Sequence, residues 1–393
     1  MYPTLPTSRA VERPFDPPEG LAELREAGPL SRMTYPDGHE GWLATGHAAV
    51  RAVLSDKRFS ARAELRHMPI PGVPSSAEPA PPGMFMSMDA PEHGRYRRLL
   101  TGQFTFRRMR LLTEHVRTIA EAYLDEIESR GGPIDLVEAY AQPIPAQVMC
   151  ELLGVPFADR ARFQEDMLGL FRLDVAAEET AATMAALFGY MGELLAAKRA
   201  DPGDDLLSGL LESDLTDEEL VNIGFLLLGA GLDTTANMIA IGVYALLSHP
   251  VQLAALRADP GLADRAVEEL LRYATIMPAL VRTALEDVEL EGETVRAGES
   301  VALSIPAADR DPAKFADPDL FDLMRPTAGH LAFGHGIHQC LGQQLARVEL
   351  QVAIPALLAR FPGLRLAAAP KDIRMRSDMV IYGVHELPVA WEV

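Results

Sequence analysis

Residues 333–342 read Phe333-Gly334-His335-Gly336-Ile337-His338-Gln339-Cys340-Leu341-Gly342. In this stretch a loop with two glycines leads to a cysteine at the start of an apolar helix. Gly336 permits backbone angles that other residues avoid, Gly342 permits the close approach of a flat ligand, and Phe333 offers that ligand an aromatic face. The free amides at the start of the helix would stabilise a thiolate at Cys340. A lone cysteine is most often a buried structural residue, but this frame instead predicts a sulfur atom that binds iron.

The segment resembles the haem-binding signature of the cytochrome P-450 superfamily, in which a phenylalanine, a glycine, the cysteine and a final glycine stand at fixed offsets. It is most similar to soluble bacterial members, which often carry the sequence Phe-Gly-His-Gly-Ile-His. The resemblance implies a mainly α fold with a minor β part and a single domain over residues 1–393. It also implies haem b (iron protoporphyrin IX) between the long central helix and the cysteine-loop helix, Cys340 as its axial thiolate, and O2 as cosubstrate.

A glutamate and an arginine stand three residues apart in Glu269-Leu270-Leu271-Arg272. In isolation such a pair is most often a solvated salt bridge worth roughly a few tenths of a kcal/mol. In the family that the chain resembles, the pair is buried below the haem and joined by a second arginine, and Arg325 stands where that partner belongs. The resemblance therefore implies a structural role for all three residues, which shape the thiolate loop.

The segment Ala230-Gly231-Leu232-Asp233-Thr234-Thr235 lies midway along the longest expected helix. Glycine and β-branched threonine are poor choices for a helix centre, and a threonine hydroxyl can bend a helix. The residues alone leave a buried polar kink and a functional pair as alternatives. The resemblance favours the pair: Thr234 donates to dioxygen, and Asp233 links it to a proton-delivering chain. Haem-thiolate oxygenation needs two protons to release one oxygen atom as water, which gives such a relay a purpose.

Two haem propionates would need cationic donors. His93 and Arg97 lie four residues apart and hence on one face of a helix. They match the family's histidine and arginine at this site, Arg282 follows the Glu269–Arg272 helix at the family's spacing, and His338 lies two residues before the cysteine. The resemblance implies that these four residues bind the propionates, whereas a side chain facing solvent is the alternative for each.

Six arginines fall within sixteen residues: Arg95, Arg97, Arg98, Arg107, Arg108 and Arg110. A charged helix face is usually just solvated, but in the family the corresponding helix borders the face where an acidic ferredoxin docks. An arginine patch on an acidic protein would orient such a partner and raise its association rate. The resemblance thus implies a ferredoxin and an NAD(P)H-dependent ferredoxin reductase as partners, and Arg108→Glu tests the docking hypothesis.

The amino-acid composition argues against binding of nucleic acid or of anionic membranes. The chain has 393 residues, of which 48% are hydrophobic and 23% charged, with 36 basic and 56 acidic residues and a net charge of −20. Such a surface repels nucleic acid and anionic membranes. Two cysteines, Cys150 and Cys340, favour a reducing compartment, and Cys150 lies in an apolar run typical of a structural core residue.

Neither a secretory signal nor a membrane anchor is expected. Residues 1–20 contain five prolines and no apolar run. The apolar stretch 221–247 is interrupted by Asp233 and Asn237, which favours a buried helix over a membrane span. We therefore expect a cytoplasmic protein.

Several segments have a clear local structure. Residues 42–54 indicate a strand followed by a helix, and 68–83, with six prolines, a loop. Helices are expected over most of 93–199, and a capping box of Thr216 and Glu219 starts a helix of about 30 residues that ends near Pro250. Further helices are expected from 262 to 273 and from near Cys340 to 360, with a kink at Pro355. Strands are expected at 284–290 and 300–305, and strand and turn over 361–393.

Substrate-contacting positions are carried over from the family, and ordinary core packing is the alternative for each. They are Phe85, Met86, Phe171, Leu226, Ala230, Ile276, Met277, Leu280, Ile381 and Tyr382. This apolar, methionine-containing set suits a sizeable lipophilic molecule. The resemblance is to actinobacterial enzymes that tailor polyketides such as macrolides.

The resemblance implies a monooxygenase that inserts one oxygen atom from O2 into a lipophilic secondary metabolite, by hydroxylation or epoxidation, for antibiotic biosynthesis. Two alternatives stay open. One is a peroxygenase that uses H2O2, against which the Asp233–Thr234 pair argues. The other is a haem-thiolate sensor without turnover, which would lack a substrate-responsive spin state.

Overall fold

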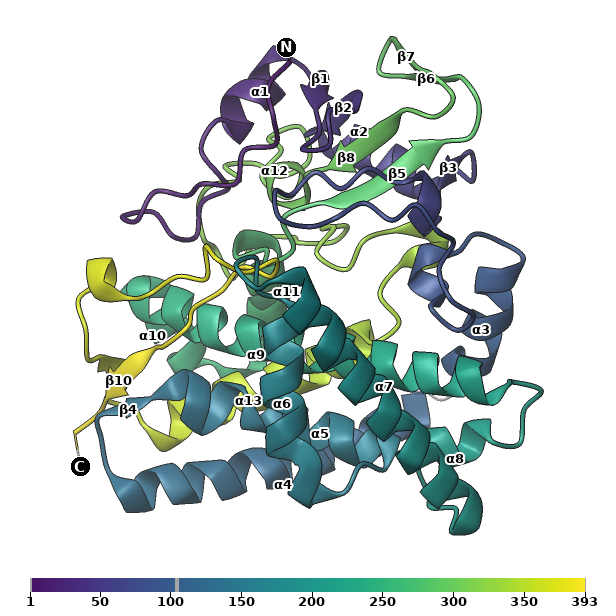
Figure 1. The fold of residues 1–393 in the computed structure, drawn as a ribbon. Coiled ribbons are helices and arrows are strands. Elements are labelled where there is room, and N and C mark those ends of the chain that lie inside the picture. The colour runs from purple at the N-terminus through teal and green to yellow at the C-terminus, as the bar shows by residue number, and fades with distance from the viewer. Residues whose placement is uncertain (1, 103–105, 393) are drawn as a thin grey trace.

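The structure, a computed structural model, describes residues 2–102 and 106–392 and confirms the mainly α fold with a minor β part (Figure 1). The α-helices in chain order are α1 Leu21–Ala27, α2 His47–Ser55, α3 Glu92–Thr101, α4 Phe106–Arg130, α5 Pro143–Leu153, α6 Arg160–Leu170, α7 Ala177–Ala200, α8 Leu206–Leu210, α9 Asp217–Ser248, α10 Pro250–Ala258, α11 Ala263–Tyr273, α12 Ile305–Ala308 and α13 Gln343–Arg360. The strands are β1 Leu30–Thr34, β2 Glu40–Ala44, β3 Phe59–Ser60, β4 Ile134–Asp135, β5 Leu280–Ala284, β6 Val288–Leu290, β7 Glu293–Val295, β8 Ser300–Leu303, β9 Arg365–Leu366 and β10 Pro388–Ala390.

Helix α9 is the central element of the helical part and runs for 32 residues. Its start is the expected capping box: Thr216 Oγ1 accepts from the Glu219 amide at 3.2 Å, and Glu219 Oε2 accepts from the Thr216 amide at 2.7 Å. The rise per residue makes the helix about 48 Å long. Helices α5, α7 and α13 pack against it. Most of its apolar window is buried inside the protein, which agrees with the expectation of a buried helix. Helix α7 is also long and apolar enough to span a membrane over Glu178–Ala200, and 22% of that window is buried inside the protein.

Three glycines of α9 lie directly against methionine side chains of neighbouring helices. A Cβ atom at Gly224, Gly229 or Gly231 would come within 2.3 to 2.5 Å of a methionine side chain from a neighbouring helix. Those methionines are Met191 of α7, Met167 of α6 and Met149 of α5. The glycines therefore leave room for these methionine side chains along the turns of α9 that precede Asp233 and Thr234.

The main sheet has the order β1-β2-β8-β5-β3, with β2 and β8 parallel and the other neighbours antiparallel. It lies with the N-terminal segment at the top of Figure 1, above the helices. The expected strand over 284–290 was wrong in its bounds. β5 ends at Ala284, and β6 begins at Val288 and forms a hairpin with β7. Asp287, whose carboxylate accepts from the Ala297 amide at 2.9 Å, belongs to the turn between β5 and β6.

The remaining expected helices and strands agree with the structure except at their ends, and the kink at Pro355 stays a prediction. The strand and helix expected over 42–54 are β2 and α2, and α11 matches the helix expected from 262. The last long helix begins at Gln343, not Cys340, and contains Pro355. The C-terminal part holds β9 and β10, and β10 pairs with both β4 and β9 in a second sheet. Cys150 is buried in α5, as expected for a structural core residue.

Candidate functional site

The loop before α13 is built around two glycines with left-handed backbones. Gly334 has φ +68° and Gly336 has φ +74°. A Cβ at Gly336 would lie 2.2 Å from the carbonyl oxygen of Leu54 in α2, so only glycine fits there. The Cys340 amide donates to the Phe333 carbonyl at 2.9 Å, which closes the loop. These contacts fix the cysteine three residues before Gln343, the first residue of α13.

The Cys340 side chain is free and reached by solvent, yet enough protein surrounds its sulfur that desolvation raises the pKa of the thiol. The Gly342 and Gln343 amides and the charges of Arg97 and Arg347 oppose this rise. The start of α13 therefore supplies the donors that were expected for a thiolate. A Cβ at Gly342 would meet no described protein atom within 4 Å, so protein packing there does not demand glycine, and the approach of a flat ligand stays the predicted reason for it.

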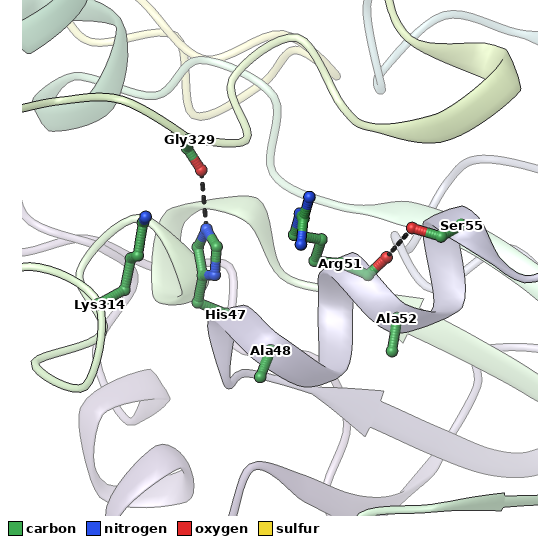
Figure 2. A pocket seen from close by; sticks show the side chains of 7 residues that line it. All are labelled: His47, Ala48, Arg51, Ala52, Ser55, Lys314 and Gly329. Carbon is green, nitrogen blue, oxygen red and sulfur yellow. Dashed lines mark hydrogen bonds between the residues drawn. The ribbon is translucent and has the colours of Figure 1, made fainter.

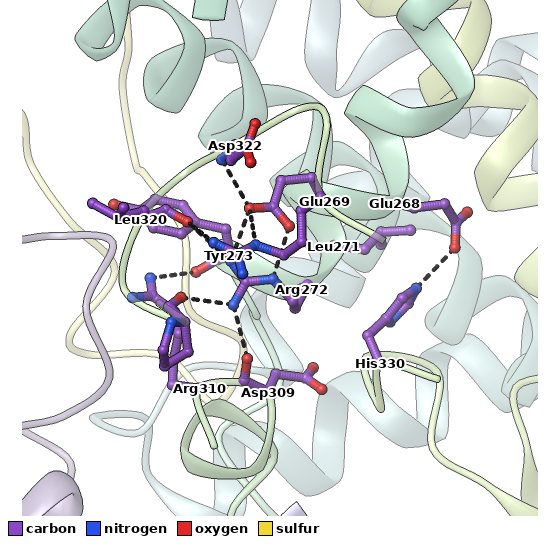
Figure 3. Close-up of polar contacts among 12 residues, drawn as sticks. Glu268, Glu269, Leu271, Arg272, Tyr273, Asp309, Arg310, Leu320, Asp322 and His330 are labelled. Atoms are coloured by element: carbon purple, nitrogen blue, oxygen red, sulfur yellow. Dashed lines mark hydrogen bonds and ion pairs between the residues drawn. The ribbon is translucent and has the colours of Figure 1, made fainter. Parts of the chain in front are cut away.

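Glu269 and Arg272 lie side by side (Figure 3), and the structure brings Arg325 to the same carboxylate. Arg272 donates from Nε and Nη2 to the two carboxylate oxygens of Glu269, both at 2.8 Å, and both side chains are 0% exposed. Arg325 Nε lies 3.3 Å from Glu269 Oε1. Arg272 also donates to the carbonyls of Asp309 and Pro318 at 2.9 and 2.8 Å, so it ties α11 to the segment before the cysteine loop.

The four expected propionate ligands converge. His93 of α3 and His338 of the cysteine loop have ring centroids 4.0 Å apart. Desolvation, Arg97 and Arg282 lower the pKa of His93 to about 4. Desolvation, Arg282, His93 and Arg97 lower the pKa of His338 to about 3, and His338 Nε2 is buried with no hydrogen-bond partner in the described chain. Burial also lowers the pKa of Arg282 to about 10.

Arg66 is a fifth member of this cationic cluster that the sequence did not reveal. Its charge lowers the pKa values of His338 and Arg282, and burial lowers its own. Nη2 donates to Ser87 Oγ at 2.8 Å, whereas its buried Nε has no partner among the described residues. Arg66 lies more than 200 residues before Arg282, and no local motif marks it. A cluster of like charges with two unpartnered buried nitrogens suits an anionic ligand.

The two residues at the centre of α9 are directed to different partners. Thr234 Oγ1 donates to the Ala230 carbonyl at 2.7 Å within the helix. The Asp233 carboxylate forms a two-point ion pair with Arg376, at 2.7 and 3.2 Å, and accepts from Asn237 Nδ2 at 3.0 Å. No hydrogen bond between Asp233 and Thr234 is present in this structure, and the ion pair with Arg376 was not foreseen.

Backbone hydrogen bonds join several of the expected substrate positions. The Val380 amide donates to the Phe171 carbonyl at 2.9 Å, and the Tyr382 amide to the Ile276 carbonyl at 3.0 Å. Phe85, Ile276 and Ile381 are buried, whereas Phe171, Leu226, Met277, Leu280 and Tyr382 are half-buried. The Leu280 side chain lies beside Gly334.

Other expected substrate positions have different surroundings. Tyr382 donates from its hydroxyl to the Pro14 carbonyl at 2.8 Å and stacks under Arg9, so the N-terminal segment covers its ring. Met86 is 55% exposed, and Ala230 is also exposed.

A surface hollow of about 510 Å³ lies beside the cysteine loop (Figure 2). His47, Arg51 and Lys314 line it, together with Ala48, Ala52, Ser55 and Gly329. His47 Nε2 donates to the Gly329 carbonyl at 2.8 Å. Since Arg51 and Lys314 are exposed, this hollow belongs to the outer surface and is separate from the cluster of His93 and His338.

The three arginines of the run whose side chains the structure describes have different surroundings. Arg95 pairs with Glu219 and Asp214, Arg97 faces the histidine cluster, and Arg98 is exposed. Arg107, Arg108 and Arg110 lie outside the residues whose side chains the structure describes.

Comparison with known proteins gives consistent matches. Residues 193–381 match the family model described as cytochrome P450. Cytochrome P450 105C1 of a Streptomyces species is 51% identical over 98% of both chains, and pentalenic acid synthase of Streptomyces avermitilis is 44% identical over 96% of this chain and 95% of its own. The crystal structure of CYP105P1 in complex with filipin I superposes with a TM-score of 0.94 at 45% identity, covering 100% of this chain and 99% of the other.

Proposed function

The chain belongs to the cytochrome P450 family and is a monooxygenase of that family, and from this premise we propose that Cys340 is the axial ligand of a haem b. The family uses a haem-thiolate iron and O2, and the iron supplies the activation of O2 when bound. The observation that carries the proposal is the cluster around His338, where unpartnered buried nitrogens and like charges stand beside the cysteine loop. Two propionates would supply the missing acceptors and offset the repulsion.

The same residues suggest how the chain would hold the group. His93, Arg97, Arg282 and His338 would bind the propionates, with Arg66 as a further donor. Phe333 and Gly342 would contact the flat face of the group, and the Gly342 and Gln343 amides would stabilise the thiolate of Cys340. Glu269, Arg272 and Arg325 would hold the loop in place without taking part in the chemistry.

We propose that Thr234 and Asp233 deliver the protons that the reaction consumes. Thr234 Oγ1 would donate a proton into the pocket, and Asp233, after taking up a proton from solvent, would return one to Thr234. The hydroxyl now donates to its own helix, and a rotation about one bond would redirect it. Asp233 would have to turn from Arg376 to pass a proton, so the ion pair would limit the relay.

Thr234→Ala tests the relay. We expect NADPH consumption to continue while product falls and H2O2 accumulates, and Thr234→Ser, which keeps a hydroxyl, to stay close to wild type. Unchanged coupling in Thr234→Ala would contradict the relay. It would then favour a peroxygenase that uses H2O2, a reading that the comparisons do not favour.

The substrate that we propose is a lipophilic secondary metabolite of the polyketide or macrolide kind, oxidised by hydroxylation or epoxidation. The apolar positions around Ile276, Phe171 and Ile381 support it. The relatives also support this substrate class, since they include pentalenic acid synthase, nocardicin C N-oxygenase and a structural neighbour crystallised with filipin I. A spectral titration against macrolides, terpenes and fatty acids tests this. A spin-state shift with macrolides is expected, whereas a response to fatty acids alone would contradict the proposed class, and no response to any compound would favour a sensor.

The electron donor that we propose is a ferredoxin, itself reduced by an NAD(P)H-dependent ferredoxin reductase. Its docking face would centre on Ile337, which is 55% exposed in the cysteine loop. Helix α2 packs against this loop on one side and α3 contacts it through His93 on another, so exposed Arg51 and Arg98 would flank Ile337. Charge reversal in Arg51→Glu should weaken ferredoxin-driven turnover and its salt dependence, with Arg365→Glu as the control. Equal turnover in both variants would contradict this face.

Two broader inferences complete the proposal. The relatives align along almost the whole chain, which supports a single P450 domain over residues 1–393. We also propose that the protein works in the cytoplasm, and the crystal structures of its relatives support a soluble protein.

A further inference from the structure

Two adjacent glutamates of α11 bind two different arginines. Glu269 pairs with Arg272, whereas Glu268 points the other way, toward His330 (Figure 3). Glu268 Oε1 accepts from Arg347 Nε at 2.5 Å, and Oε2 accepts from Arg347 Nη2 at 3.1 Å and from His330 Nε2 at 2.9 Å. Partial burial alone would raise the pKa of Glu268, but the bonds from His330 and Arg347 outweigh it and lower the pKa to about 2. Glu268 is therefore a charged, fully engaged carboxylate.

Arg347 lies between this carboxylate and the cysteine loop. It stands one turn after Gln343 in α13 and donates to the Gln343 carbonyl at 3.3 Å. Its guanidinium carbon lies 4.6 Å from the centroid of the Phe333 ring, and the Phe333 carbonyl is the acceptor for the Cys340 amide. Its charge also acts on the Cys340 sulfur. With its side chain only 20% exposed, Arg347 is held in one orientation by the two-point bond to Glu268.

We propose that Arg347 and Glu268 form an oriented charge pair that sets the reduction potential of the iron bound at Cys340. This rests on the proposed role of Cys340 as the iron ligand. The positive end of the pair faces the loop and stabilises the additional electron of the reduced iron, while the carboxylate lies behind it and opposes this effect. Arg347 and Glu268 are positioning residues, since they act through Phe333 and Cys340.

The two halves of the pair should shift the potential in opposite directions. Arg347→Gln removes the positive charge and should lower the midpoint potential, whereas Glu268→Gln leaves Arg347 without its counter-charge and should raise it. We expect a change of about tenfold in the ratio of reduced to oxidised protein at fixed applied potential, or 59 mV for one electron. Arg347→Lys, which keeps the charge, should stay near wild type. Arg265→Gln, on an exposed position of α11, should leave the potential unchanged.

The measurement is a spectroelectrochemical titration of each haem-loaded variant. Both Gln variants break the same ion pair, so a merely structural role predicts shifts of the same sign. Shifts of the same sign, or none in either variant, would overturn the proposal. If Arg347→Gln fails to bind haem, Glu268→Gln alone decides the test, and a lower or unchanged midpoint potential in that variant would overturn the proposal. Failure of the proposed function is distinguishable, because the wild-type protein would then lack the carbon monoxide spectrum of a haem thiolate.

Discussion

The ion pair between Asp233 and Arg376 gives a sharp test of how the centre of α9 is stabilised. Asp233 is 3% exposed and Arg376 5%, and two hydrogen bonds join them across 143 residues of sequence. Arg376→Gln removes the charge that balances Asp233. Asn237 Nδ2 would remain as a donor to the carboxylate at 3.0 Å.

The loss of stability expected for Arg376→Gln follows from the burial of both side chains of the ion pair. Breaking a buried pair by removing one partner usually costs about 3–5 kcal/mol, because the other charge is left uncompensated. The bond from Asn237 offsets part of this, so we expect a loss near the lower end, about 3 kcal/mol. Asp233→Asn removes the stranded charge. The double variant should therefore be more stable than the sum of the single losses, with a coupling energy of about 2 kcal/mol.

The assay is urea unfolding of the haem-loaded protein, followed by circular dichroism, for the four members of the cycle. Arg374→Gln is the matched control, since Arg374 is exposed and lies two residues away in the same segment. It should change the free energy of unfolding by less than about 0.5 kcal/mol. Additive single losses, with a coupling energy below about 0.5 kcal/mol, would refute the reasoning.

Three further predictions test the loop, the cation cluster and a buried acid. Burial raises the pKa of Glu349 from 4.5 to about 8, so the folded protein keeps a proton that the unfolded chain loses, and stability falls as pH rises from about 4.5 to 8. Glu349→Gln should remove this slope and raise the free energy of unfolding at pH 8 by on the order of 3 to 5 kcal/mol. If the variant kept the wild-type slope of unfolding free energy against pH, the prediction would be contradicted. Gly336→Ala should lower the free energy of unfolding by more than about 2 kcal/mol and weaken the carbon monoxide band, because its Cβ meets the Leu54 carbonyl. The control Gly38→Ala, at a residue with φ +88° and open space around it, should lower the free energy of unfolding by only about 1–2 kcal/mol. Equal shifts in melting temperature for the two variants would contradict the clash. Arg66→Gln should speed transfer of haem to apomyoglobin about tenfold, the equivalent of one charged hydrogen bond, and an unchanged rate would place Arg66 outside the haem site.

Features encoded by neighbouring residues could be predicted from the sequence. The capping box at Thr216 needs only residues three apart, and the cysteine loop needs only a ten-residue pattern. The family resemblance extended this to Glu269, Arg272 and Arg325, which the structure brings together. The site's frame was predictable because each motif carries its own geometry.

Partners from distant segments could not be predicted. Arg66 joins the cation cluster and Arg376 binds Asp233 only because the fold places them there, and no spacing or composition marks either residue. The exposure of Met86 and the covering of Tyr382 by the N-terminal segment depend equally on tertiary packing. The roles assigned to these residues stay predictions until they are tested.

The most direct test of the central claim is the absorption spectrum of the reduced, carbon monoxide-treated protein with and without the Cys340 sulfur. We predict that Cys340→Ser loses the strongly red-shifted Soret band of a haem thiolate. Cys150→Ala, which changes the buried thiol of α5, should keep it. A red-shifted band that survives in Cys340→Ser would contradict the assignment of Cys340 as the iron ligand.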